Sequence, residues 1–131
     1  MTVVFVYGTL KRGGALHHAL ESSEFLAVGA LPNYALHDLG WFPGIVPEEG
    51  TLTRGELFRV DEETLADLDQ IEGTPSLYRR EIVSVVTRLR HTGSRAKSRA
   101  LYSAHAYIYN GTPLEGNKII SGHWPVDGGE G

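Results

Sequence analysis

The stretch VFVYGTLKRGG (residues 4–14) joins an apolar segment to a glycine-rich loop. Residues 2–7 are β-branched or aromatic and lack helical spacing, which predicts a strand covered on both faces. Gly8 ends this strand, and two further glycines precede a short helix predicted over residues 15–20. A strand, a glycine turn and a helix start together point backbone N–H groups at an anion or a carbonyl oxygen. The stretch therefore predicts a ligand-binding loop, with a plain strand-to-helix turn as the alternative.

This loop does not match the common phosphate-binding motifs. Gly8 and Gly13 have the spacing of a Walker A motif, but Gly14 and Ala15 stand where that motif has Lys and Ser or Thr. The three glycines of a dinucleotide-binding fingerprint are also missing. The loop thus offers backbone amides without the side chains that usually accompany a bound nucleotide.

Length and composition predict one domain over residues 1–131, with a partly irregular tail over residues 118–131. Hydrophobic residues make up 41% of the chain, yet no apolar run is long enough for a membrane helix. The N-terminus lacks the flanks of a signal peptide. Zero cysteines exclude disulfides and thiolate sites, and the net charge of −4 argues against nucleic acid. We expect a cytoplasmic protein with no membrane or nucleic-acid partner.

Six or so strands and two short helices are predicted along the chain, with turns at Pro32-Asn33 and at Glu48-Glu49-Gly50. The strands are expected over residues 2–7, 25–30, 34–39, 54–60, 78–89 and 101–109, an irregular strand over 41–47, and the helices over 15–20 and 62–72. The number and length of these strands predict an α+β fold whose sheet curls toward a barrel.

Five cations gather around His91-Thr92-Gly93-Ser94, at Arg88, Arg90, Arg95, Lys97 and Arg99. No aromatic residue lies between Arg90 and Ala100, so bases would find no stacking platform there. We interpret residues 90–99 as a solvated hairpin loop, with a patch for an anionic partner as the alternative.

Glu72 is the residue best placed for acid–base chemistry. The predicted helix 62–72 follows the N-cap Asp61 and stops before Gly73, so Glu72 stands at its C-terminus. The apolar stripe of this helix consists of Leu65, Leu68 and Ile71. Glu72 lies on or beside the stripe, where burial and the helix dipole both disfavour the charged form. These effects predict a raised pKa suited to a general acid or base, unless Glu72 reaches water from the margin of the stripe.

Five segments, in order along the chain, resemble γ-glutamylcyclotransferase-like (AIG2-like) proteins. The segments are YGTLKRGG, FPGIVP, RGELFRVD, LDQIEGTPSLYRR and AHAYIYN. The resemblance runs from about Val3 to Asn110, and the ordered set is more specific than any one motif. It is closest to the short bacterial members and to the γ-glutamylamine cyclotransferase branch.

The resemblance implies a small mixed β-barrel and an enzyme that uses no metal or cofactor. It implies that the α-amine of a γ-glutamyl amide attacks its own γ-carbonyl, releasing 5-oxoproline and a free amine. It places the catalytic glutamate at Glu72. The substrate-binding residues that it implies are Tyr7, Gly8, Thr9, Leu10 and Tyr107. The expected partner is a small γ-glutamyl amide, bound by a monomer or a homodimer.

Two other functions stay open at this point. One is a non-catalytic binding domain for a γ-glutamyl or other carboxylated ligand. The other is a hydrolase in which Glu72 activates water to cleave a γ-glutamyl amide. The amine leaving group is not identified by any of these residues.

Several further residues are weaker candidates. The six histidines lack the spacing of metal ligands. Glu56 is the second candidate acid, with an ion pair to an arginine as the alternative. Tyr78 and Arg79 either support Glu72 or belong to the edge of the core. Asn117 stands where some relatives have a tyrosine near the substrate, and His123 receives no role.

Overall fold

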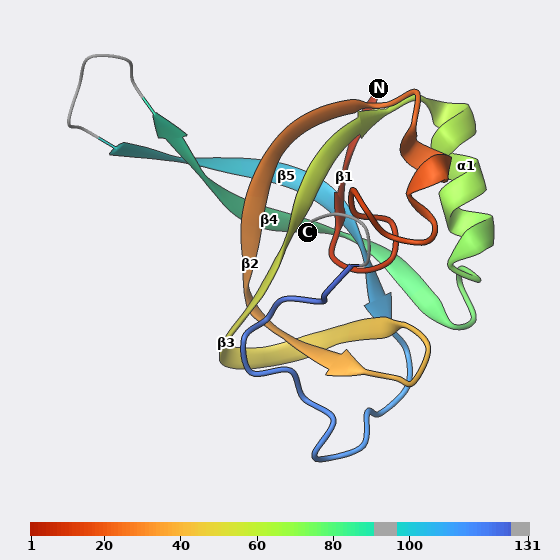
Figure 1. Cartoon of the computed structure of the whole chain (residues 1–131), viewed down its shortest axis with the longest axis vertical. Helices are drawn as coiled ribbons and strands as arrows, with labels where there is room; N and C mark the ends of the chain where they lie inside the picture. The colour runs from red at the N-terminus through yellow and green to blue at the C-terminus, as the bar shows by residue number, and fades with distance from the viewer. Residues whose placement is uncertain (91–96, 127–131) are drawn as a thin grey trace.

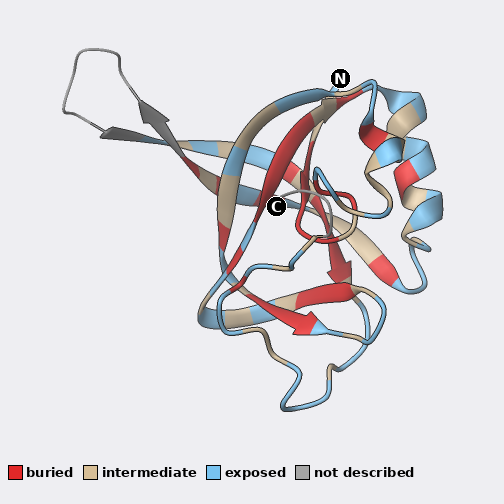
Figure 2. Ribbon diagram, in the orientation of Figure 1, coloured by how far each residue is buried: buried red, intermediate tan, exposed pale blue. Residues whose placement is uncertain are grey.

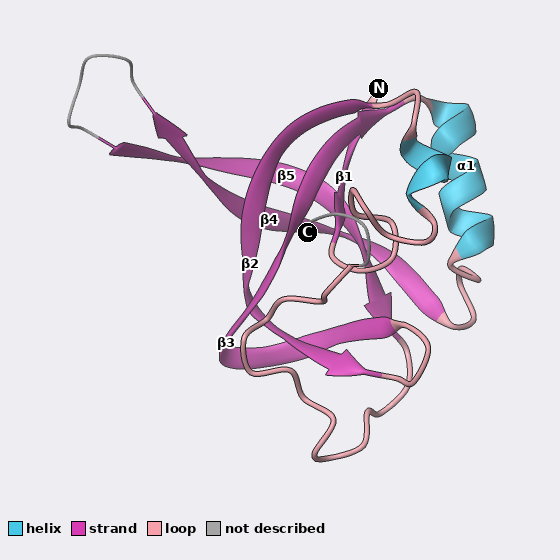
Figure 3. Cartoon of the chain, viewed as in Figure 1, coloured by secondary structure: helices cyan, strands magenta, loops and turns pink. Residues whose placement is uncertain are grey.

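A computed structural model describes residues 1–90 and 97–126, and these form a closed five-stranded barrel with a helix on one side (Figure 1). The elements are β1 (Thr2–Val6), the 3-10 helix η1 (His17–Leu20), β2 (Glu24–Asp38), β3 (Pro43–Val60), α1 (Glu62–Ile71), β4 (Tyr78–Arg90) and β5 (Lys97–Tyr109). Figure 3 shows that strands dominate the chain. The predicted α+β fold is confirmed.

The strands follow the order β1-β3-β2-β4-β5 around the barrel. Four of the neighbouring pairs are antiparallel, and β1 closes the ring by pairing with β5 in parallel at Val4 and His105. The barrel is therefore mixed, as the resemblance implies. β1 lies between β3 and β5, which brings the loop that follows it close to the C-terminal end of β5.

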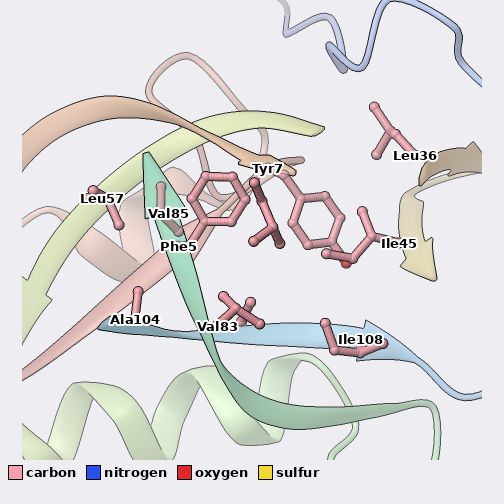
Figure 4. Close-up of a cluster of buried hydrophobic side chains, with 11 residues drawn as sticks. Phe5, Tyr7, Leu36, Ile45, Leu57, Val83, Val85, Ala104 and Ile108 are labelled. Atoms are coloured by element: carbon pink, nitrogen blue, oxygen red, sulfur yellow. The ribbon is translucent and has the colours of Figure 1, made fainter. Parts of the chain in front are cut away.

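The core is divided into a barrel interior and a layer beneath α1. Figure 4 shows the interior cluster, which contains Phe5, Tyr7, Leu31, Leu36, Ile45, Leu57, Val83, Val85, Ala104, Ala106 and Ile108. The second cluster contains Val4, Val6, Leu10, Leu20, Phe58, Val60, Leu68, Tyr78 and Tyr107. β1 contributes alternate residues to both clusters, so it is covered on both faces, as its apolar run predicts. Much of α1 is exposed, whereas β1 is largely buried (Figure 2).

Two predicted turns do not separate strands. Pro32 and Asn33 lie inside β2, where Asn33 has a φ of 67° and the register with β3 shifts. The side-chain oxygen of Asn33 accepts a hydrogen bond from the N–H of Gly50 at 3.0 Å. The predicted turn around Gly50 is thus a bulge within β3. The prediction of separate short strands here is wrong, because pairing continues on both sides of each irregularity and produces two long strands.

The two helices match their predictions unequally. α1 starts as expected, since Asp61 Oδ1 accepts the N–H of Thr64 at 2.8 Å. Gly73 follows its C-terminus with a φ of 66°, which favours glycine. The helix predicted over residues 15–20 is present only as η1, because the N–H of Leu16 instead donates to Thr9 O at 2.9 Å and folds this segment back on the loop.

The segment after β5 returns across the barrel without forming a strand (Figure 1). Its backbone is held to β2 and β3, through Ile119 N to Leu36 O at 2.8 Å and Arg54 N to Gly122 O at 2.7 Å. None of the helices that the structure describes is long and apolar enough to cross a membrane. The basic loop predicted over residues 90–99 lies largely outside the described residues.

Candidate active site

The six residues proposed for catalysis or substrate binding all line one pocket, between the end of β1 and the C-terminus of α1. They are Tyr7, Gly8, Thr9, Leu10, Glu72 and Tyr107. The other lining residues are Phe5, Val6, Phe42, Pro43 and Tyr78. The pocket therefore combines residues from β1 and its loop, the β2–β3 hairpin, the end of α1, and β4 and β5. We refer to it as the Glu72 pocket.

Glu72 enters this pocket from the C-terminal end of α1. Its backbone N–H still donates to Leu68 O at 2.9 Å, so the last helical turn fixes its position. Within the part of the chain that the structure describes, its carboxylate has neither an ion-pair partner nor a hydrogen-bond donor. Desolvation raises the pKa of Glu72 from 4.5 to about 7. A carboxyl group with this pKa exchanges its proton readily near neutral pH.

Three tyrosines surround Glu72, and each hydroxyl has an acceptor. Tyr7 donates to Tyr107 O at 2.7 Å, Tyr78 donates to Pro43 O at 2.6 Å, and Tyr107 donates to Asp69 Oδ1 at 2.7 Å. Burial raises the pKa of all three hydroxyls, and the nearby charge of Glu72 raises it further. The tyrosines therefore stay neutral and hold the wall of the pocket in place.

In the loop after β1, the carbonyl oxygens are hydrogen-bonded to the loop itself and to the segment that follows it. Lys11 N donates to Gly8 O at 3.0 Å, Leu16 N donates to Thr9 O at 2.9 Å, and His17 Nδ1 lies 2.9 Å from Leu10 O. Among the described residues, no acceptor is found for the N–H groups of residues 8, 9 and 10. Three successive amides in a pocket wall are suited to bind a carboxylate or a developing oxyanion.

Gly8 is required by close packing rather than by an unusual backbone angle. A Cβ at this position would lie 2.4 Å from Pro43 Cγ and 3.0 Å from Pro43 Cδ. A Cβ on Gly14 would lie 2.2 Å from Thr9 O, within the same loop. The shape of the loop therefore depends on both glycines.

Asp69 and Arg80 support the pocket and were not singled out from the sequence. Asp69 accepts the Tyr107 hydroxyl and also binds Arg80, with Nε to Oδ1 at 2.8 Å and Nη2 to Oδ2 at 3.1 Å. The position of Asp69 three residues before Glu72 places both on neighbouring turns of one helix face. The three-residue spacing from Glu72 could have indicated from the sequence that Asp69 lies near the site. No local sequence feature indicates that Phe42 and Pro43 line the pocket.

The weaker candidates lie outside the Glu72 pocket, except Tyr78. Glu56 binds Arg12, with the backbone N–H to Oε1 at 2.9 Å and Nε to Oε2 at 3.2 Å, so it forms the ion pair that was the alternative to a catalytic role. Arg79 pairs with Glu81. Asn117 and His123 do not line the pocket. Across residues 1–90 and 97–126, no three or more His, Asp or Glu side chains are arranged to hold a metal ion.

Similarity to one family of known proteins extends over nearly the whole chain. The family described as gamma-glutamyl cyclotransferase, AIG2-like matches residues 4–126. The chain is 33% identical over 122 residues to the gamma-glutamylcyclotransferase family protein YtfP of Escherichia coli K12, covering 92% of this chain and 94% of that protein. It is 41% identical over 96 residues to human gamma-glutamylaminecyclotransferase, covering 65% of this chain and 62% of the human protein.

The fold is similar to that of a solved archaeal structure. An uncharacterized protein from Pyrococcus horikoshii superposes with a TM-score of 0.70 and 28% sequence identity. The superposition covers 94% of this chain and 89% of the archaeal chain. The barrel described above is therefore shared over almost its full length.

Proposed function

Because this chain belongs to the gamma-glutamyl cyclotransferase (AIG2-like) family, we propose that it cyclises γ-glutamyl amides to 5-oxoproline without a metal or cofactor. The observation that carries the proposal is the Glu72 carboxylate, with a pKa of about 7, beside three backbone amides, all of which lack partners within residues 1–90 and 97–126. The substrate is a small γ-glutamyl amide, and the products are 5-oxoproline and an amine.

Glu72 acts first as a base. The α-ammonium group of the substrate is not a nucleophile until it loses a proton, and the Glu72 carboxylate accepts that proton. The freed nitrogen then attacks the γ-carbonyl carbon, forming the new C–N bond of a five-membered ring. The attacking and attacked atoms belong to one molecule, so the pocket contributes mainly by holding the γ-glutamyl chain bent.

Glu72 then acts as an acid. The tetrahedral intermediate collapses when the original amide C–N bond breaks and the leaving nitrogen takes a proton from the Glu72 carboxyl group. The regenerated carboxylate then takes the extra proton from the ring nitrogen, which leaves the neutral ring amide of 5-oxoproline and the free amine. The backbone N–H groups of Gly8, Thr9 and Leu10 bind either the α-carboxylate or the oxyanion of the intermediate. The neutral wall of Tyr7, Tyr78 and Tyr107 keeps the carboxyl group desolvated, which maintains its raised pKa.

A substrate screen tests this proposal. The panel contains γ-glutamyl amides of α-amino acids, of the lysine ε-amine and of polyamines, with mass detection of 5-oxoproline. The best substrate is then compared with its analogue acetylated on the α-amine. The acetylated compound should be inert, because its nitrogen no longer serves as a nucleophile although its amide bond is unchanged.

The same comparison separates the two other functions. Equal cleavage of both compounds, with the free γ-carboxylic acid as product, would identify water as the nucleophile and the protein as a hydrolase. Saturable binding of γ-glutamyl amides with no turnover of any member of the panel would identify a binding domain.

A further inference from the structure

A second cavity lies on the other side of the loop that follows β1. It has a volume of about 750 Å³ and is bounded by β2, β3, β4, β5, this loop and the C-terminal segment. Figure 1 shows the C-terminal segment, in dark blue, returning toward the loop after β1. The charged lining consists of Lys11, Arg54, Arg99 and Glu56, and His123 also lines the cavity. We refer to this cavity as the cationic groove.

The positive charge of the groove is not balanced by its own acids. Among the described lining residues Glu56 is the one acid, and its carboxylate already binds the backbone N–H and the Nε of Arg12. Within the described residues, Lys11, Arg54 and Arg99 form no ion pair with a carboxylate. The sequence also has no Asp or Glu between residues 82 and 114, so β5 and the part of β4 after Glu81 supply none.

Lys11 is the most unusual of these cations, because it is buried. Its exposed fraction is 3%, and its ammonium group donates to Trp124 O at 2.7 Å. An ammonium has three donors, and the described residues supply only this one acceptor. Burial lowers the pKa of Lys11, although the charge of Glu56 opposes the effect. A buried cation with open donors is unfavourable by itself and is stabilised when an anion binds.

Arg54 and His123 face the same space as Lys11. Burial lowers the pKa of His123, and the charges of Lys11 and Arg54 lower it further, so these groups lie close together. Aliphatic side chains complete the wall, with Val28 61% exposed and Leu52 37% exposed. The lining formed by the described residues contains no aromatic side chain, so it offers no stacking surface for a nucleobase.

We propose that the cationic groove is a second binding site, which takes a small aliphatic anion with two or more carboxylates between Lys11, Arg54 and Arg99. Arginine binds carboxylates through paired N–H groups, and the aliphatic wall fits the carbon skeleton between them. Lys11 directly follows Leu10 of the Glu72 pocket, so the groove and the pocket share one loop. This site does not depend on the proposed cyclotransferase activity.

Calorimetric titration with citrate at neutral pH and low salt tests the site. Citrate should bind saturably to one site, and its trimethyl ester should not bind. Arg54→Gln should weaken citrate binding about tenfold or more, since a charge-assisted contact is lost. Arg59→Gln is the matched control, because Arg59 lies on the same strand, pairs with Glu24 and does not line the groove. This control should change the dissociation constant less than about twofold.

Two further titrations test whether citrate binds in the groove and through its carbon skeleton. Glu72→Gln should bind citrate as the wild type does, because Glu72 lies in the other pocket. Inorganic phosphate should bind more weakly than citrate, because it lacks a carbon skeleton for the aliphatic wall. The proposal is overturned by absence of citrate binding at roughly 10 mM, by equal weakening in Arg54→Gln and Arg59→Gln, by stronger or weaker citrate binding in Glu72→Gln, or by phosphate binding as tightly as citrate.

Discussion

Glu72 and Glu56 lie on either side of the loop that follows β1, and they differ in whether a cationic side chain binds the carboxylate. Glu56 is 9% exposed, and Arg12 binds both of its oxygens. Glu72 is partly buried, and the described residues place no cation against it, so burial raises its pKa to about 7. Burial removes water from both side chains, but a cation compensates only Glu56, and the pKa of Glu72 is raised.

The same contrast extends to the two cavities. The Glu72 pocket has one carboxylate among neutral tyrosines, whereas the cationic groove has several cations and one acid that is already paired. A single loop of backbone separates these environments of opposite charge. Local pairing, rather than the net charge of the chain, therefore decides the chemistry available on each side.

The largest expected effect is on turnover in Glu72→Gln. This variant keeps the shape of the side chain and removes proton transfer, so turnover should fall by about 10²–10⁴-fold. Glu56→Gln is the matched control and should keep most of the activity, because the amide oxygen still accepts the Arg12 N–H. Steady-state rates of 5-oxoproline release measure both. A Glu72→Gln enzyme with a tenth of wild-type turnover would remove Glu72 from the mechanism.

Gly8→Val should cost about 10²-fold in activity. The new Cβ would meet Pro43 Cγ at 2.4 Å, so the loop and Pro43, which both line the Glu72 pocket, must move apart. Thr9→Ala is the control and should retain most of the activity, because the proposed contact uses its backbone N–H. Thermal unfolding of both variants separates loop displacement from general loss of fold. Comparable losses of activity in the two variants would contradict backbone-mediated binding.

Glu72→Gln should also change stability in a pH-dependent way. Its pKa is about 7 in the folded protein and 4.5 in the ordinary side chain, so the folded state holds the proton more tightly. Protonation of Glu72 therefore adds to the free energy of unfolding. This contribution is fully present below pH 4.5 and is lost as pH rises through about 7. At pH 8 the variant should therefore be more stable than wild type by up to about 3 kcal/mol, and at pH 4 equally stable.

Denaturant unfolding of both proteins at several pH values measures this difference. A constant difference between wild type and Glu72→Gln from pH 4 to pH 8 would show that the Glu72 carboxyl group titrates normally.

The pH dependence of kcat/KM should follow the ionisation of the Glu72 carboxyl group. The base must be ionised, so kcat/KM should rise about tenfold per pH unit below pH 6 and level off above a midpoint near the pKa of about 7. Rates of 5-oxoproline release between pH 5 and pH 8 measure the profile. A profile that is flat from pH 5 upward would assign the base to a group with an ordinary carboxyl pKa.

The smallest expected effect is that of Tyr107→Phe. This change removes the hydrogen bond to Asp69 but leaves Asp69 bound to Arg80 and the ring in its place. We expect a loss of stability of about 1 kcal/mol and a several-fold decrease in kcat/KM. If Tyr107→Phe lowered turnover as far as Glu72→Gln, the hydroxyl would take part in the proton transfer itself.

The local sequence pattern was sufficient to predict those features that are controlled by residues close together in the chain. The apolar run of residues 2–7 predicted a strand buried on both faces, and Asp61 and Gly73 marked the ends of α1. The ordered motifs also pointed to six residues that line one pocket. The strand and the helix ends depend on side-chain periodicity, capping and backbone freedom, which are properties of short segments, whereas the six pocket residues followed from the resemblance to the family.

Tertiary structure decided the features that depend on distant partners. Pro32 and Asn33 resemble a turn, yet pairing on both sides keeps β2 continuous. Asp69 has no distinctive role in the sequence pattern, yet the fold brings it to Tyr107 and Arg80. Whether a carboxylate is paired, as Glu56 is with Arg12, or has no cation among the described residues, as Glu72 has none, depends on which side chains the fold brings near it. Desolvation and ion pairing act through space between residues that are distant in the chain. The sequence alone therefore identified the candidate carboxylates, and only the folded barrel determined which of them lies beside a cation.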